Sequence, residues 1–97
     1  MATINTLARP YAKAAFEHAS AAGGLDAWSG MLALAAAAVQ DDAFAARMRN
    51  PGLTEERKAD DLLMVCEGHV DDAFGNFIRT LSEHDRLPLI PVIDELF

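Results

Sequence analysis

The sequence predicts an all-α fold, a compact six-helix bundle formed by a single domain of 97 residues. Apolar residues recur at helical spacing along almost the whole chain, and no segment alternates apolar and polar residues as a half-buried strand does. Hydrophobic residues make up 52% of the chain, and many of them are alanine, the strongest helix former. A domain of this size buries roughly two-thirds of its unfolded surface, which suffices for one modest core.

Helix-breaking residues divide the chain at four places: 23–24, 50–52, 68 and 85–88. These breaks leave five segments, which hold six predicted helices because the segment 25–49 contains two of them. They are a first helix that begins between residues 4 and 10 and ends at 22, followed by 26–40, 42–49, 54–67, 71–84 and 87–97. The last segment ends on apolar Phe97 without a polar cap, so we expect a truncated sixth helix and a chain that is a fragment of a longer protein.

The first predicted helix carries more apolar surface than one-sided packing requires. At 100° per residue its apolar side chains span roughly 220°, against the ~100° that a surface helix needs. They are Ile4, Leu7, Ala8, Tyr11, Ala12, Ala14, Ala15, Phe16, Ala19 and Ala22. Such a helix is either central in its bundle or offers one side to a partner. Pro10 removes a backbone hydrogen bond, so we expect a kink or a late start there.

The second and fifth predicted helices carry single apolar stripes that indicate core packing. In the second helix the stripe is Trp28, Met31, Leu32, Ala35 and Val39, and we expect Trp28 to lie mainly in the core. In the fifth helix it is Phe74, Phe77, Ile78 and Leu81. Beside this second stripe the small residues Gly75 and Ser82 are expected to leave backbone accessible.

The net charge of −7 disfavours nucleic acid and anionic membrane surfaces as partners, because an acidic surface repels phosphate groups. The first 20 residues carry Arg9 and Lys13 against Glu17 alone, so the acidity lies in the remaining chain. The single cysteine, Cys66, cannot form an internal disulfide and suits a reducing compartment. The longest apolar run, 31–39, is about half of the ~18 residues that a membrane span requires. We therefore expect a soluble, cytoplasmic protein without membrane insertion.

The residue types that carry catalysis or metal binding occur without the spacing that either function needs. The three histidines lie on three different elements, and no second histidine or cysteine stands at ligand spacing. Three acidic pairs occur, and two of them precede predicted helices, where caps are needed, so we interpret all three as caps and solvated surface. These residues are His18, His69 and His84, and Asp41-Asp42, Asp60-Asp61 and Asp71-Asp72. We predict no catalytic residue, no cofactor and no metal.

Two stretches resemble a known family. Residues 7–16, Leu-Ala-Arg-Pro-Tyr-Ala-Lys-Ala-Ala-Phe, resemble the N-terminal signature of ATP synthase delta subunits, the family of the mitochondrial oligomycin-sensitivity-conferring protein. Residues 76–97, from Asn-Phe-Ile-Arg-Thr-Leu to the terminal Asp-Glu-Leu-Phe, resemble the same family's fifth and sixth helices. The spacing of the two stretches and Trp28 also fit. His84-Asp85 departs from the pattern, because a turn such as Asn-Gly is expected there, and this leaves the end of the fifth helix open.

The resemblance implies a non-catalytic adaptor on the cytoplasmic side of the bacterial inner membrane, which ties the catalytic head of an F-type ATP synthase to its peripheral stalk. In the family, the first and fifth helices form a shallow apolar groove that receives the N-terminal helix of an alpha subunit. The matching positions are Leu7, Tyr11, Ala14, His18, Asn76, Phe77, Arg79 and Thr80. The b subunits of the stalk bind a second region that this chain lacks, so we expect this chain to bind the head and not the stalk.

Two other classes of protein stay open at this point. A free-standing enzyme or enzyme subunit is disfavoured, because no catalytic constellation is found. An acidic helical bundle that forms homodimers through the exposed stripe of its first helix is the stronger alternative. Sedimentation at varied concentration separates a dimer from the monomer that we expect.

Overall fold

The computed structural model describes residues 3–97, which form six α-helices and one short 3-10 helix. In chain order the elements are α1 (Ile4–Ala21), α2 (Leu25–Gln40), α3 (Asp42–Met48), α4 (Glu55–Val65), α5 (Asp72–Glu83), η1 (Leu87–Leu89) and α6 (Ile90–Leu96). No strand occurs in residues 3–97, so the predicted all-α class is confirmed. None of the helices in this range has both the length and the apolar character needed to cross a bilayer.

Local capping chemistry explains where the helices begin and end. Four of them start behind a residue whose side-chain oxygen accepts a backbone N–H of the first turn. These caps are Thr3, Asp41, Thr54 and Asp71. Helix α1 ends because Gly23 adopts a left-handed conformation, φ 69°, and the N–H of Gly24 donates back to the carbonyl of Ala19 at 2.8 Å. Two of the three acidic pairs thus supply caps, as predicted.

Both proline-containing segments differ from the simplest prediction. Helix α1 begins at Ile4 and continues through Pro10, so a late start at the proline is wrong. Pro10 lies on an exposed face, where water can replace the backbone hydrogen bond that a proline cannot donate. The predicted sixth helix is divided, because the chain makes a 3-10 turn over Leu87–Leu89 before α6 starts with Pro91 in its first turn.

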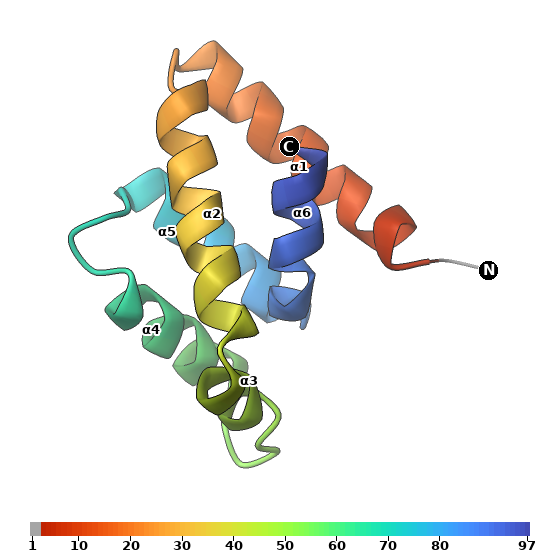
Figure 1. The fold of residues 1–97 in the computed structure, drawn as a ribbon, viewed down its shortest axis with the longest axis vertical. Helices are drawn as coiled ribbons and strands as arrows, with labels where there is room; N and C mark the ends of the chain where they lie inside the picture. Colours follow the sequence, from red (N-terminus) through yellow and green to blue (C-terminus); the bar gives the residue numbers. More distant parts are fainter. Residues whose placement is uncertain (1–2) are drawn as a thin grey trace.

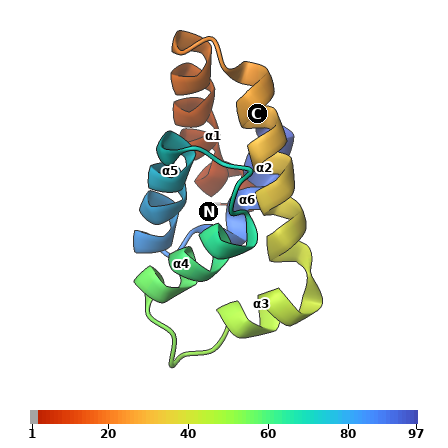
Figure 2. The same cartoon turned by 90° about the vertical axis from the view of Figure 1, so that its left-hand side faces the viewer.

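The core is one cluster to which every element except α3 contributes buried side chains. Helix α6 packs against both α1 and α2, and α4 packs against α5 (Figures 1 and 2). Helix α3 contacts α2 at one end of the molecule and has no fully buried residue. The largest apolar side chains that are completely buried are Leu32, Leu62, Phe74, Ile78, Leu81, Ile90 and Ile93.

The small-residue flank of α5 faces α4 rather than solvent, so the prediction of accessible backbone there is wrong. Ser82 is only 1% exposed, and its hydroxyl donates a hydrogen bond to the backbone carbonyl of Glu55 at the start of α4. A Cβ atom added at Gly75 would lie 3.9 Å from Leu63 of α4. The small side chains therefore let α4 approach α5 closely.

The end of α5, which the sequence left open, is formed without glycine. Asp85 takes the left-handed conformation, φ 56°, that glycine usually fills after a helix. The N–H of Asp85 donates to the carbonyl of Ser82 at 3.0 Å, and the N–H of Arg86 donates to that of Leu81 at 2.8 Å. These two bonds satisfy carbonyls of the last turn and stop the helix at Glu83.

Candidate partner-binding surface

Helix α1 shows a central buried stripe with apolar residues on both of its flanks. The buried stripe consists of alanines alone: Ala8, Ala12, Ala15 and Ala19. The larger apolar residues of this helix lie on either side of the stripe, where they stay partly exposed. The sequence predicted this surplus from the width of the apolar arc, and the structure shows that it lies on two opposite flanks.

One flank lies on the side of α5 and contains the four α1 residues predicted for the groove. Leu7 is 37% exposed, Ala14 and His18 are exposed, and Tyr11 is half-buried against the core. Ile4, which is 58% exposed, stands on the same side one turn before Leu7 but was not among the predicted site residues. The position of Ile4 in the apolar arc of the first helix is the sequence signal that could have identified it as a site residue.

Trp28 forms an aromatic floor that connects this flank to α5. The indole ring is 4% exposed, and its centroid lies 5.3 Å from the ring of His18 and 5.6 Å from that of Phe77. Phe74, a buried residue of α5, contacts the same indole edge-on, with the two ring centroids 5.2 Å apart. His18 and Phe77, which were predicted for the site from distant parts of the chain, thus both contact the Trp28 ring. The prediction that Trp28 belongs to the core is confirmed.

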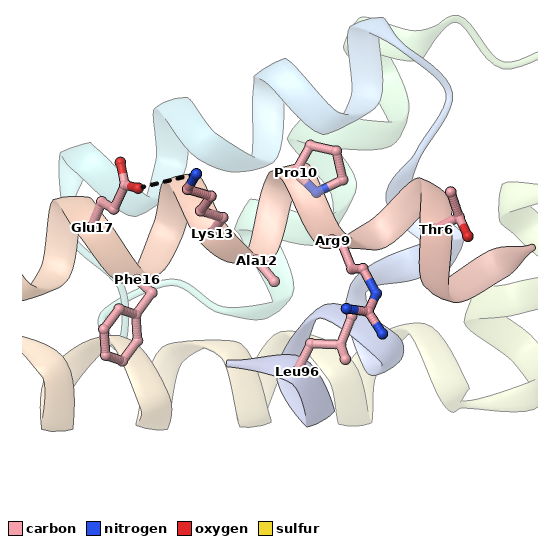
Figure 3. Close-up of a pocket in the computed structure, with 8 residues that line it drawn as sticks. All are labelled: Thr6, Arg9, Pro10, Ala12, Lys13, Phe16, Glu17 and Leu96. Atoms are coloured by element: carbon pink, nitrogen blue, oxygen red, sulfur yellow. Dashed lines mark ion pairs between the residues drawn. The ribbon is translucent and has the colours of Figure 1, made fainter. Parts of the chain in front are cut away.

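Helix α5 runs antiparallel beside α1, on the side of α1 away from α6 (Figures 2 and 3). Thr80 follows Phe77 at i+3 and shares its flank of α5. We call the combined set of residues the α1–α5 surface. It consists of Leu7, Tyr11, Ala14 and His18 of α1 and Phe77 and Thr80 of α5.

The remaining two predicted residues, Asn76 and Arg79, point away from α1. The guanidinium Nη2 of Arg79 lies 2.8 Å from Oδ1 of Asp60 on α4. Asn76 and Arg79 also line a hollow of about 530 Å³ together with Leu63 and other residues at the α4 side of α5. The structure therefore does not bring these two side chains to the α1–α5 surface.

The Asp60-Asp61 pair, interpreted from sequence as solvated surface, instead joins helices through ion pairs. Asp60 holds Arg79 of α5, and Oδ2 of Asp61 lies 2.8 Å from Nε of Arg47 on α3. Oδ1 of Asp61 also lies 3.6 Å from Nε of Arg57 one turn earlier on α4. Both carboxylates therefore contribute to holding α3, α4 and α5 together.

The opposite flank of α1 borders a hollow of about 700 Å³ that the sequence did not predict (Figure 3). We call it the α1–α6 hollow. Its lining residues are Thr6, Arg9, Pro10, Ala12, Lys13, Phe16, Glu17 and Leu96. Phe16 is 44% exposed, and its ring stands edge-on to Phe97 with centroids 5.6 Å apart. Sequence reasoning missed the hollow because only the folded chain places the end of α6 beside α1.

The single cysteine is buried at the end of α4. Burial raises the pKa of the Cys66 thiol above its ordinary value, and this thiol is 1% exposed beyond the end of α4. In residues 3–97 no three histidine, cysteine, aspartate or glutamate side chains gather in a way that could hold a metal ion.

Comparison with known proteins identifies the family. The family model described as ATP synthase delta (OSCP) subunit matches residues 7–97. The proteins named ATP synthase subunit delta of Ectopseudomonas mendocina and Azotobacter vinelandii are each 57% identical over 97 residues, which cover 100% of this chain and 54% of the relative. The protein of the same name from Hahella chejuensis is 50% identical with the same coverage. The chain spans about half the length of these curated relatives. It belongs to the ATP synthase delta (OSCP) subunit family.

Proposed function

We propose that this chain is a non-catalytic stator adaptor of an F-type ATP synthase, and that it links the catalytic head to the peripheral stalk. Its membership of the delta family supports this role, as do relatives named ATP synthase subunit delta. The chain binds the N-terminal helix of an alpha subunit on the α1–α5 surface. It acts at the cytoplasmic side of the bacterial inner membrane within the complex, and the b subunits contact a region of the family outside these 97 residues.

The observation that carries the proposal is an apolar flank of α1 that the other elements of residues 3–97 leave partly uncovered. Leu7 and Ile4 expose large aliphatic side chains, and Tyr11 is only half-buried. Burial of such surface stabilises a complex by roughly 25 cal/mol per Å² before the costs of association. An amphipathic helix with apolar residues at i, i+3 or i+4 and i+7 is the ligand that matches a flank of this shape.

Within this surface the residues have different tasks. Ala14 is the smallest exposed side chain of the flank and is the point where a partner helix can approach most closely. Tyr11, one turn earlier, supplies a large aromatic side chain that can anchor the partner. His18 and Phe77 rest on the Trp28 ring and fix the floor between the two helices.

The first test uses a peptide that contains the N-terminal segment of the cognate alpha subunit. Ala14→Asp should weaken its binding roughly 30- to 1000-fold, because an unpaired carboxylate would be desolvated beneath the peptide. Ala14 is exposed, so the melting temperature of the free chain should hardly change. Ala37→Asp is the matched control, because it places the same charge on the exposed face of α2. Equal affinity of the two variants would contradict the proposed site.

The second test removes the aromatic anchor. Tyr11→Ala should cost binding about 1–3 kcal/mol, yet cost folding less than the ~3 kcal/mol expected of a core aromatic. An amide shift map of the parent chain with the peptide should show changes along α1 and at Phe77 and Thr80. Early melting of both the Tyr11 and the Ala14 variant, with binding lost only through unfolding, would contradict the proposed site.

A further inference from the structure

Helices α2 and α3 and the 3-10 turn η1 enclose a further hollow of about 200 Å³, which we call the α2–α3–η1 pocket. Its lining residues are Val39, Ala45, Met48, Arg49, Leu87 and Pro88. None of residues 89–97 lines it, and the C-terminus lies at the far end of α6 from α3 (Figures 1 and 2). The pocket is therefore shaped by α2, α3 and η1 alone.

The lining of this pocket is apolar except at one edge. Leu87 is 3% exposed and belongs to the core, and Val39 and Met48 are half-buried against the core. Apolar cavities stay dry, and one of about 150 Å³ can hold a benzene ring. Met48 also has a flexible side chain that adapts to the shape of what it contacts. The pocket therefore suits a compact hydrocarbon group, such as a phenyl ring with a short chain.

Arg49 supplies the one charged group of the lining. It is exposed at the C-terminal cap of α3, and no carboxylate among residues 3–97 lies within ion-pair distance of it. Arg47 and Arg57, by contrast, both pair with Asp61. A guanidinium binds a carboxylate through two parallel N–H···O bonds. The carboxylate of a ligand whose hydrocarbon part fills the pocket can make this contact with Arg49.

Helix α3 can admit such a ligand because it lies on the surface of the bundle. It packs against α2, and none of its seven residues is fully buried. Its ion pair to α4 joins Arg47 to Asp61. A small outward movement of α3 would open the pocket without disturbing the buried side chains of the core.

We propose that the α2–α3–η1 pocket binds a small apolar carboxylate. The hydrocarbon group lies among Val39, Met48 and Leu87, and the carboxylate pairs with Arg49. A medium-chain fatty acid and an aromatic carboxylate share this chemistry and differ in shape. We expect a Kd on the order of 1 mM, because so few ligand atoms are buried. The pocket is separate from the α1–α5 surface, so this proposal does not depend on binding of an alpha subunit.

The experiment compares ligands that differ only in their head group. 3-Phenylpropanoate is the carboxylate, 3-phenylpropan-1-ol is its neutral counterpart and 3-phenylpropylamine is its cationic counterpart. Titration of the carboxylate into this chain should shift the amide signals of Ala45, Met48 and Leu87. The alcohol should bind roughly tenfold more weakly, and the amine more weakly still, because neither can pair with a guanidinium as a carboxylate does. Octanoate is titrated in parallel, and the tighter of the two carboxylates identifies an aromatic or an aliphatic ligand.

Matched variants locate the interaction. Arg49→Gln should weaken 3-phenylpropanoate roughly tenfold, yet leave the affinity for the alcohol within about twofold. Arg9→Gln is the control, because Arg9 is also exposed and also has no carboxylate within ion-pair distance among residues 3–97. It should leave both affinities within about twofold. Ala45→Leu fills the pocket from α3 and should weaken both ligands by at least about fivefold.

Four results would overturn the proposal. They are equal affinity for 3-phenylpropanoate and the alcohol, equal loss in Arg49→Gln and Arg9→Gln, unchanged binding by Ala45→Leu, or no shift at the pocket with any carboxylate at several times the expected Kd. Circular dichroism checks that each variant is folded. Arg49 and Arg9 are exposed, so their two variants decide the question even where Ala45→Leu fails to fold.

Discussion

At the scale of single residues, Trp28 is the side chain on which the fold and the proposed function both depend. Its ring contacts His18 of α1 and Phe74 and Phe77 of α5. The alanine stripe of α1 supplies little volume, so this one indole fills much of the space between the two helices. The residue that supports the α1–α5 surface is therefore a core residue of α2.

Replacement of Trp28 by alanine should lower the free energy of unfolding by about 3–5 kcal/mol, through lost burial and the cavity left behind. This is a large fraction of the roughly 5–10 kcal/mol expected for a small domain. Trp28→Phe keeps an aromatic ring on Phe74 and Phe77 and should cost much less. Urea unfolding of both variants measures the difference. Equal and small effects would place Trp28 outside the core.

Asp85 allows a second prediction at this scale. Because its φ of 56° is unfavourable for a residue with a Cβ atom, Asp85→Gly should raise the free energy of unfolding by about 0.5 kcal/mol, net of the extra unfolded-state entropy of glycine. Asp85→Ala should lower it by about 1 kcal/mol, since alanine has no side-chain polar group that stabilises this conformation. Thermal unfolding compares the two. The same sign for both changes would contradict the left-handed geometry.

At the scale of helices, the two flanks of α5 serve different neighbours. Phe77 and Thr80 belong to the α1–α5 surface, whereas Gly75, Arg79 and Ser82 face α4. Helical periodicity places residues on faces but does not say which neighbour each face meets. For this reason the stripe of α5 was predictable, and the direction of Arg79 was not.

Substitutions on the α4-facing flank should change stability without changing alpha-peptide binding. Ser82→Ala removes the buried hydrogen bond from the Ser82 hydroxyl to the carbonyl of Glu55 and should cost about 1 kcal/mol, because that carbonyl keeps its bond within α4. Arg79→Ala removes an ion pair whose two side chains are both 46% exposed, so it should cost less than about 1 kcal/mol. Both variants should bind the alpha peptide within about twofold of the parent. A large loss of affinity in Arg79→Ala would restore Arg79 to the binding surface.

The limits of sequence reasoning at this scale have physical causes. Glycine and proline fixed most helix boundaries to within one or two residues, because these residues act locally on the backbone. The predicted single helix over 87–97 did not reveal that Leu87–Leu89 forms a separate 3-10 turn. The α1–α6 hollow depends on a contact between Phe16 and Phe97, which are 81 positions apart, and no local pattern records such a contact.

At the scale of the whole molecule, α1 lies between two apolar surfaces and is held to the bundle by small residues. Its buried stripe packs against α2, η1 and α6, while one flank faces α5 and the other borders the α1–α6 hollow. The family signature in residues 7–16 covers both flanks, and it therefore includes part of the α1–α5 surface.

Because the core is one connected cluster, residues 3–97 should unfold as a single cooperative unit. We also expect the chain to remain monomeric. The unfolding enthalpy at the midpoint should be roughly 70 kcal/mol, from about 0.7 kcal/mol per residue. Far-ultraviolet circular dichroism reports the helices, and the fluorescence of Trp28, the sole tryptophan, reports the packing between α2, α1 and α5. The two transitions should coincide.

The midpoint temperature should also stay constant over a hundredfold range of protein concentration, because a monomer gains no stability from mass action. A midpoint that rises with concentration would instead support the homodimer, in which the exposed flanks of α1 are covered by a second copy. In that case Ala14→Asp or Arg9→Glu would change the concentration dependence, and the variant that does so identifies the flank involved. Sedimentation of the same two variants checks the assignment, since only the affected flank would lower the mass of the complex.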